Sequence, residues 1–196
     1  MPLKRNIKEE KAALRSHYRA LREAMPQEKK QKLDRMIFQK LMTLREYERA
    51  AVVFCYVSKD IEVNTMPILE QVLSSGRMLA VPRCIPGTPH MDFYEIHSLD
   101  DLAPGSFGLL EPKIESCRKV TDVSSGLCIL PGFCFDRDGY RLGYGKGYYD
   151  RFLSAFSGPA AGICYSSFVI DALPHGYFDQ RADIMVTEKY IHRQHR

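Results

Sequence analysis

The 196-residue sequence has no tryptophan, and it has no apolar run long enough to cross a membrane. Its longest clean apolar run covers the eight residues 50–57, whereas a membrane-spanning helix needs about 18 or more. The opening residues Met-Pro-Leu-Lys-Arg-Asn lead directly into charged sequence, without an apolar signal region. We therefore expect a protein that neither crosses a membrane nor is secreted, and we place it in the cytoplasm.

The sequence also lacks the usual patterns of disulfide and zinc proteins. Its six cysteines never form a Cys-x-x-Cys pair, and four of them lie in apolar runs, where a reduced cysteine behaves as a small hydrophobe. The histidines show no His-x-x-x-His spacing. We expect reduced cysteines, no zinc site, and surface positions for His90, His97, His175, His192 and His195.

Neither sign of charge dominates, because 28 lysines and arginines against 24 aspartates and glutamates leave a formal net charge of +4. That balance is compatible with an anionic small molecule, with nucleic acid, or with neither. No internal repeat, low-complexity stretch or long Pro/Gly/Ser linker divides the chain. We therefore expect residues 1–196 to form a single domain.

Strand-like segments alternate with helical ones along the chain. The strand candidates, rich in β-branched and aromatic residues, are 51–57, 78–84, 91–96, 126–135, 160–165 and 183–187. Several are apolar throughout, which is typical of strands buried on both faces of a parallel sheet, and helical segments such as 64–75 separate them. The sequence therefore predicts an α/β fold, a single-domain three-layer open sheet that is mostly parallel, with helices on both faces. In such sheets ligands bind beyond the carboxyl ends of the strands.

The predicted N-terminal helix carries two stripes. Its apolar stripe, which we expect to pack on the core, consists of Ile7, Leu14, Tyr18, Leu21 and Met25. A cationic stripe runs beside it and consists of Lys4, Lys8, Lys11, Arg15, Arg19 and Arg22. The cationic stripe is either a solvated polar face or a contact surface for an anion, and the spacing does not decide between them. Pro26 ends this helix and opens a second one through about Leu44, to which we assign no chemistry.

A glycine-rich loop follows the longest apolar strand candidate. After the turn signal Asp136-Arg-Asp-Gly, residues 141–147 read Arg-Leu-Gly-Tyr-Gly-Lys-Gly, so the backbone can approach a ligand closely and direct N–H groups at an anion. Lys146, with Arg141 and Arg151 at the flanks, adds positive charge. A helix predicted from Tyr148 directs its N-terminal dipole at the same place. The loop matches neither the P-loop nor the dinucleotide-binding spacing, so a flexible loop before an amphipathic helix is the alternative.

The first turn of that helix adds further candidates. Asp150 either complements the helix dipole or, beside bound phosphates, holds Mg²⁺ directly or through water. Tyr148 and Tyr149 either belong to the core or stack on a flat ring and hydrogen-bond a reacting group. We interpret the segment as the phosphate site of an enzyme that uses a nucleotide triphosphate.

Residues 130–151 read Leu-Pro-Gly-Phe-x-Phe-Asp-x-x-Gly-x-Arg-Leu-Gly-Tyr-Gly-Lys-Gly-Tyr-Tyr-Asp-Arg, which resembles the signature of the 5-formyltetrahydrofolate cyclo-ligase family. The likeness extends in the same order over nearly the whole chain, through the Lys11/Arg15 helix, residues 56–62, Val81-Pro82-Arg83, Phe107-Gly-Leu-Leu-Glu-Pro112 and residues 183–188. The chain departs from many relatives at Gly176 and Phe178, where those have an acidic residue and a histidine, and at Ser58-Lys59-Asp60.

The resemblance implies an ATP- and Mg²⁺-dependent ligase that converts 5-formyltetrahydrofolate to 5,10-methenyltetrahydrofolate and releases ADP and phosphate. ATP would activate the N5-formyl group through a phosphorylated imidate intermediate, because resonance makes an amide carbon a poor electrophile. The expected partner is this small molecule, with or without a polyglutamate tail, and not nucleic acid or a membrane. We expect the protein to act as a monomer.

The family match also implies roles for individual residues. It assigns catalysis to Lys146, Arg141 and Tyr148. It assigns ATP binding to Lys11, Arg15, Arg141, Leu142, Gly143, Tyr144, Gly145, Lys146, Gly147, Tyr148 and Tyr149. It assigns folate binding to Val57, Glu62, Tyr144, Gly145, Lys146, Gly147 and Tyr148, and the metal to Asp150 and Asp183.

Two other functional classes compete with this one. A nucleic-acid binder could use the basic helix for phosphates and aromatic strands for bases, although no RNA-module motif is present. Another α/β enzyme acting on a phosphorylated metabolite, such as a sugar-phosphate isomerase, could use a similar loop without ATP.

Overall fold

The computed structural model describes residues 6–105 and 108–194, so Lys4, Phe107 and His195 lie outside the described residues. Its centre is an eight-stranded sheet with the order β13-β12-β10-β7-β1-β2-β3-β6. The strands are β1 (Val52–Cys55), β2 (Met78–Cys84), β3 (Met91–Ile96), β6 (Arg118–Val120), β7 (Leu127–Leu130), β10 (Ala160–Ile163), β12 (Ile184–Val186) and β13 (Ile191–Arg193).

Five adjacent strands of this sheet, β2, β1, β7, β10 and β12, run parallel, while β3, β6 and β13 are antiparallel additions at the two ends. Two smaller sheets accompany it. One joins β8 (Cys134–Asp136), β9 (Arg141–Leu142) and β11 (Val169–Ile170), and the other pairs β4 (Leu102–Pro104) with β5 (Leu110–Pro112).

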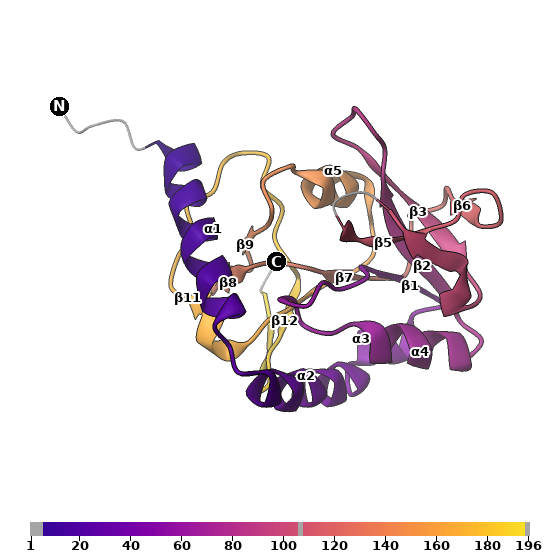
Figure 1. Ribbon diagram of the computed structural model, residues 1–196, viewed down its shortest axis with the longest axis horizontal. Helices are drawn as coiled ribbons and strands as arrows, with labels where there is room; N and C mark the ends of the chain where they lie inside the picture. The colour runs from indigo at the N-terminus through magenta and orange to yellow at the C-terminus, as the bar shows by residue number, and fades with distance from the viewer. Residues whose placement is uncertain (1–5, 106–107, 195–196) are drawn as a thin grey trace.

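Helices cover both faces of the central sheet (Figure 1). In that view α2 (Gln27–Met42), α3 (Arg45–Arg49) and α4 (Met66–Ser74) lie below the sheet, and α5 (Tyr148–Ala155) lies above it. Helix α1 (Ile7–Glu23) stands to one side, next to β8 and β9. The predicted α/β fold with a large, mostly parallel sheet between helices is confirmed. Within the described part of the chain, no helix combines the length and the apolar content that a bilayer span requires.

The apolar segment 126–135 forms two strands, not the single strand predicted. β7 ends at Leu130, and β8 begins at Cys134 in a different sheet. Pro131 has no N–H group for a sheet ladder. The guanidinium of Arg22 binds the next two carbonyl oxygens, those of Gly132 at 2.6 Å and Phe133 at 3.0 Å. A side chain from α1 therefore takes the acceptors that a continuing strand would have used.

The inward face of α1 differs from the predicted apolar stripe. Tyr18 is buried, and Leu14 and Met25 pack partly buried against the core. Ile7 and Leu21, however, are exposed, so their predicted core positions are wrong. The inward face turns toward the cationic stripe because α1 covers carbonyl-rich strand ends and loops, which polar side chains satisfy better than leucine does.

Gly162 on β10 provides a test of core packing. A Cβ at this position would lie 2.3 Å from Cε1 of the fully buried Phe135. We expect Gly162→Ala to lower the free energy of unfolding by about 1–3 kcal/mol, measured by urea titration, because a crowded core must shift. Gly176→Ala is the control, since among the described residues its Cβ would meet one atom, Oδ2 of Asp179, at 3.7 Å. Equal stability of the two variants would contradict this packing.

Candidate active site

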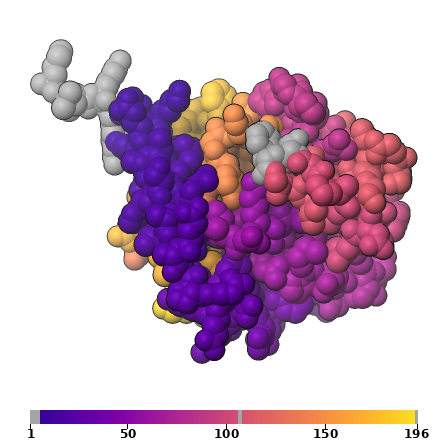
Figure 2. Space-filling view, in the orientation of Figure 1, coloured from indigo at the N-terminus to yellow at the C-terminus, as the bar shows by residue number. Residues whose placement is uncertain are grey.

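A pocket of about 630 Å³ opens at the carboxyl ends of β1, β2 and β7. One wall is α1, a second is the loop 143–147 with the start of α5, and a third is β5 with the end of β2. Figure 2 shows the three regions meeting on one face of the molecule, with α1 in indigo, the α5 region in orange and the strands in magenta and pink. The site lies where open α/β sheets bind ligands.

The pocket gathers nearly all of the residues for which the sequence predicts a role. Those that line it are Lys11, Arg15, Val57, Glu62, Arg141, Leu142, Gly143, Tyr144, Gly145, Lys146, Gly147, Tyr148, Tyr149 and Asp150. Segments more than 100 residues apart in the sequence thus share one cavity. Their individual roles stay predictions.

Asp183 is the exception, because the structure does not bring it to the pocket. It precedes β12, at the amino end of the parallel strands, and its Oδ2 accepts the N–H of Ala160 at 2.9 Å. Asp179, four residues earlier, does line the pocket, and its Oδ2 lies 2.6 Å from Nζ of Lys11. A metal shared by Asp150 and Asp183 is not supported.

The glycine loop is tied to α1 by a hydrogen bond. Nε of Arg15 donates to the carbonyl oxygen of Gly143 at 2.8 Å. Gly145 has φ of 92°, and a Cβ there would lie 3.0 Å from the Arg15 guanidinium carbon, so both the backbone and the close approach favour glycine. Gly147, with φ of 70°, is the N-cap of α5. The loop thus forms a wall of the pocket and is held to α1 by the hydrogen bond from Arg15.

The cationic stripe of α1 also faces the site. Lys11, Arg15 and Arg19 line the pocket, and Arg22 is buried beneath it with its Nη1 donating to the carbonyl oxygen of Ile61 at 2.9 Å. Partial burial lowers the pKa of Arg15, and the Asp179 carboxylate opposes that shift. A solvated polar face is therefore the wrong interpretation for the buried Arg22 and does not describe the half-buried Lys11 and Arg15, whereas Arg19 and Lys8 are exposed as that interpretation requires.

Arg141 donates its hydrogen bonds to protein atoms. Its Nη2 lies 2.8 Å from Oδ1 of Asp150, and its Nη1 donates to the carbonyl oxygen of Gln180 at 2.9 Å. The N–H of Gln180 donates to the same Asp150 oxygen at 3.1 Å. The side chain of Arg141 is 5% exposed. Arg141 thus joins the segment before β12 to the first turn of α5 and orients Asp150.

The donor set suits Mg²⁺ only when phosphates accompany it. Within the described residues, no group of three histidine, cysteine, aspartate or glutamate side chains could enclose a metal ion. Asp150 and Asp179 each offer a carboxylate to the pocket but are paired with Arg141 and Lys11. Mg²⁺ in nucleotide sites takes most of its ligands from phosphate and water and one or two from carboxylates, and these residues fit that arrangement.

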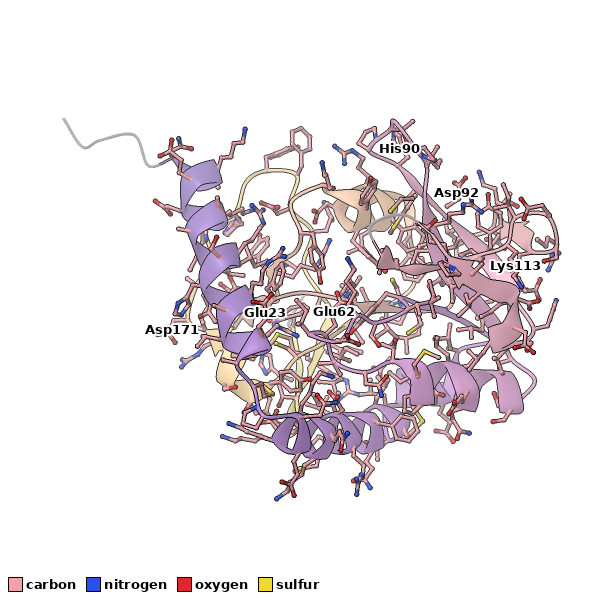
Figure 3. The ribbon with its side chains drawn as sticks, viewed as in Figure 1. Glu23, Glu62, His90, Asp92, Lys113 and Asp171 are labelled. Atoms are coloured by element: carbon pink, nitrogen blue, oxygen red, sulfur yellow. The ribbon has the colours of Figure 1, made fainter. Side chains whose placement is uncertain are left out.

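Glu62 lies at the floor of the pocket and is 6% exposed. Its Oε1 accepts from the hydroxyl of Tyr144 at 2.9 Å, and its Oε2 accepts the N–H of Lys59 at 2.7 Å. Burial raises the pKa of Glu62, and these two hydrogen bonds partly offset the shift. Burial and the nearby Glu62 raise the pKa of Tyr144, so its hydroxyl remains a donor. In Figure 3 Glu62 lies centrally, between α1 and the strands.

The raised pKa of Glu62 predicts that this residue lowers the stability of the fold as pH rises. Because its pKa is higher in the folded than in the unfolded protein, Glu62 stabilises the fold below the unfolded pKa and loses that contribution as pH rises through the folded value. We expect the melting temperature of Glu62→Gln minus that of the native protein to increase from pH 4 to pH 7. Glu115→Gln, at an exposed position, controls for removal of charge alone. A melting-temperature difference for Glu62→Gln that does not change between pH 4 and pH 7 would contradict the raised pKa of Glu62.

Sequence reasoning missed much of the third wall. It consists of Pro82, Cys84 and Met91 from β2 and β3, with Leu109, Leu110 and Glu111. Burial raises the pKa of the Cys84 thiol, which fits its place among apolar side chains. Lys59, from the stretch that departs from the relatives, lies with Nζ 5.4 Å from the Tyr144 ring centre. These residues come from separate segments that only the strand order brings together.

Comparison with known proteins agrees with this geometry. The sequence profile of the 5-formyltetrahydrofolate cyclo-ligase family matches residues 7–188. A probable 5-formyltetrahydrofolate cyclo-ligase of Schizosaccharomyces pombe is 30% identical over 174 residues, which cover 80% of this chain and 84% of the relative. The 5-formyltetrahydrofolate cyclo-ligase of Escherichia coli K12 is 28% identical over 178 residues, 88% of this chain and 97% of the relative.

Solved structures give the same result. The NMR structure of Aquifex aeolicus 5,10-methenyltetrahydrofolate synthetase superposes with a TM-score of 0.81 at 33% identity and covers 93% of this chain and 92% of that one. A 5,10-methenyltetrahydrofolate synthetase from Mycoplasma pneumoniae has a TM-score of 0.71 at 25% identity, covering 91% and 98%. The chain therefore belongs to the 5-formyltetrahydrofolate cyclo-ligase family.

Proposed function

We propose that this protein catalyses the ATP- and Mg²⁺-dependent cyclisation of 5-formyltetrahydrofolate to 5,10-methenyltetrahydrofolate, with release of ADP and phosphate. One observation carries the proposal: a single pocket joins a cation-lined glycine loop to a buried carboxylate flanked by aromatic rings. The first half suits a triphosphate and the second suits a flat ring with N–H donors. Membership of the family supports the same pairing.

In the nucleotide half, the amides of residues 143–147 and the side chains of Lys146, Lys11 and Arg15 would bind the phosphates. Lys146 is exposed at the rim, where it is available to an incoming ligand, and Arg15 already contacts the loop. Mg²⁺, held beside Asp150 and Asp179, would neutralise phosphate charge. Arg141 acts in this proposal by orienting Asp150, because its Nη2 donates to that carboxylate and its Nη1 to the Gln180 carbonyl oxygen.

In the folate half, Glu62 would accept hydrogen bonds from the amino and ring N–H groups of the pterin. Its oxygens each have one protein donor, so each retains a lone pair for a ligand. Tyr144 lies against Phe133, with ring centres 4.6 Å apart, and offers a face for stacking. Val57 and Tyr148 complete the surface around the ring.

The proposed chemistry has two steps. The formyl oxygen attacks the γ-phosphorus of ATP, the bond to the β-γ bridging oxygen breaks, and ADP leaves. N10 then attacks the activated formyl carbon and loses its proton, while phosphate departs with the electron pair of the C–O bond. Negative charge builds up on the transferring phosphoryl group, where Lys146 and Arg15 would stabilise it. No step needs a further nucleophile from the protein.

The competing classes gain no support from the geometry. Lys11 and Arg15 line a pocket rather than an open basic surface, which does not favour a nucleic-acid role. A sugar-phosphate isomerase would leave the apolar third wall without a purpose. A cytoplasmic location and a monomeric state stay predictions from the sequence.

A direct assay tests the proposal. Purified protein is mixed with 5-formyltetrahydrofolate, Mg²⁺ and ATP, and the near-ultraviolet absorbance of the methenyl product is followed, with ATP omitted in the control. We expect an absorbance rise that requires ATP. If no such rise occurs with a folded protein, the proposed activity is refuted, and salt-sensitive retardation of RNA in a gel would then favour the nucleic-acid class.

A further inference from the structure

Glu111, on β5, is a buried carboxylate that the proposed reaction does not yet use. It lines the pocket and is 5% exposed. Among residues 6–105 and 108–194, its Oε1 finds no hydrogen-bond partner. Its other oxygen, Oε2, forms a long ion pair with Nε of Arg83 at 3.8 Å, beyond hydrogen-bond distance, and Nη1 of Arg83 donates to the Pro112 carbonyl oxygen at 3.0 Å.

The other carboxylates that line the pocket have closer ion-pair or hydrogen-bond partners than Glu111 has. Asp150 is paired with Arg141 at 2.8 Å and Asp179 with Lys11 at 2.6 Å. Glu62 accepts one hydrogen bond at each oxygen. Glu111 is the one whose buried oxygen lacks a partner in the described part of the chain. A buried acceptor without a donor destabilises a fold, so such a group in a ligand pocket points to a donor on the ligand.

The surroundings of Glu111 indicate whether it contacts the nucleotide or the folate. The cations suited to phosphate lie on α1 and on the loop 143–147, and a carboxylate would repel a triphosphate there. Glu111 instead shares its wall with apolar side chains, those of Pro82, Cys84, Met91, Leu109 and Leu110. Such a wall suits a flat ring system that carries N–H donors, as a reduced folate does.

We propose that Glu111 accepts a hydrogen bond from an N–H group of the folate substrate, as a second recognition carboxylate besides Glu62. The inference rests on the proposed function, because it takes 5-formyltetrahydrofolate as the ligand. It assigns to the third wall a polar contact that orients the substrate. Nucleotide binding does not involve Glu111.

The test compares Glu111→Met, which removes the acceptor, with Glu111→Gln, which keeps one acceptor oxygen and removes the charge. Binding of 5-formyltetrahydrofolate alone and of Mg·ADP alone is measured by calorimetry. For Glu111→Met we expect the folate Kd to rise by about 10- to 100-fold, the usual effect of losing a hydrogen bond to a charged group. Glu111→Gln should give a smaller rise, and the Kd for Mg·ADP should stay within twofold in both.

Thermal unfolding of the ligand-free protein supplies a second measurement. Removing a buried carboxylate with one unpartnered oxygen should raise the melting temperature of Glu111→Met by about 2–6 °C, with Glu111→Gln between it and the native protein. Glu115→Gln, a carboxylate-to-amide change at an exposed position close in sequence, is the matched control and should leave both Kd values unchanged. If Glu111→Met does not fold, Glu111→Gln and its control decide.

Two results would overturn the assignment. One is a folate Kd within twofold of native in every folded Glu111 variant. The other is a weaker Kd for Mg·ADP with unchanged folate binding, which would give Glu111 to the nucleotide. A native protein that binds 5-formyltetrahydrofolate but forms no methenyl product with ATP would refute the proposed reaction and leave the folate contact standing.

Discussion

Lys146→Ala should lower ATP-dependent formation of the methenyl product by about 100-fold or more, the usual effect of removing one preorganised contact to transition-state charge. Lys146 lies between two glycines whose left-handed backbone shapes the loop, and its exposed side chain reaches the pocket from the rim. Steady-state kinetics measure the change. The melting temperature should barely move, because an exposed lysine contributes little to folding.

Lys32→Ala is the matched control, since Lys32 is an exposed lysine on α2, and Figure 1 shows α2 on the opposite side of the sheet from α5. Its turnover should equal that of the native protein. Full turnover in Lys146→Ala would remove Lys146 from the phosphate site. A loss in both variants would show that the effect is one of overall charge.

Arg22→Met should produce the largest loss of stability. Its guanidinium is buried and donates to the carbonyl oxygens of Ile61, Gly132 and Phe133. Removing it leaves buried acceptors without donors, for which we expect a loss of about 3 kcal/mol in the free energy of unfolding. For a chain of this size that corresponds to a melting temperature lower by about 6–12 °C.

The loss should extend to folate binding, because Ile61 directly precedes Glu62, the proposed pterin acceptor. Arg35→Met, at an exposed arginine on α2, is the control and should be nearly neutral. Calorimetric unfolding of both variants measures the difference. Equal melting temperatures would mean that water replaces the guanidinium as the donor to these carbonyl oxygens. That result would contradict a stabilising role for the buried Arg22 beneath the pocket.

Local sequence pattern was sufficient to predict helices and strands whose residue types and spacing match a single element. The predicted strands 78–84 and 91–96 match β2 and β3 to the residue, and the helix predicted from Tyr148 begins there. The phosphate loop was identifiable because glycines, a lysine and a helix start are contiguous. Pairing of this loop with α1 was visible only through the resemblance to the family.

Features that depend on distant contacts were not predictable from spacing. The break between β7 and β8 depends on Arg22, more than 100 residues away in the sequence, which binds the carbonyls at the break. The family match implied a metal ligand at Asp183, but the strand direction places this residue at the amino end of β12. Glu111 belongs to a three-residue strand, and the alternation of apolar and polar residues in so short a strand does not reveal which face of the sheet Glu111 occupies.

The stoichiometry of a single reaction tests the central claim most directly. With the native protein, 5-formyltetrahydrofolate, Mg²⁺ and ATP, ADP and the methenyl product are quantified in the same samples over time. The proposed mechanism predicts one ADP for each methenyl group formed and neither product when folate or ATP is omitted. Methenyl product without ADP, or ADP release that does not depend on folate, would contradict it.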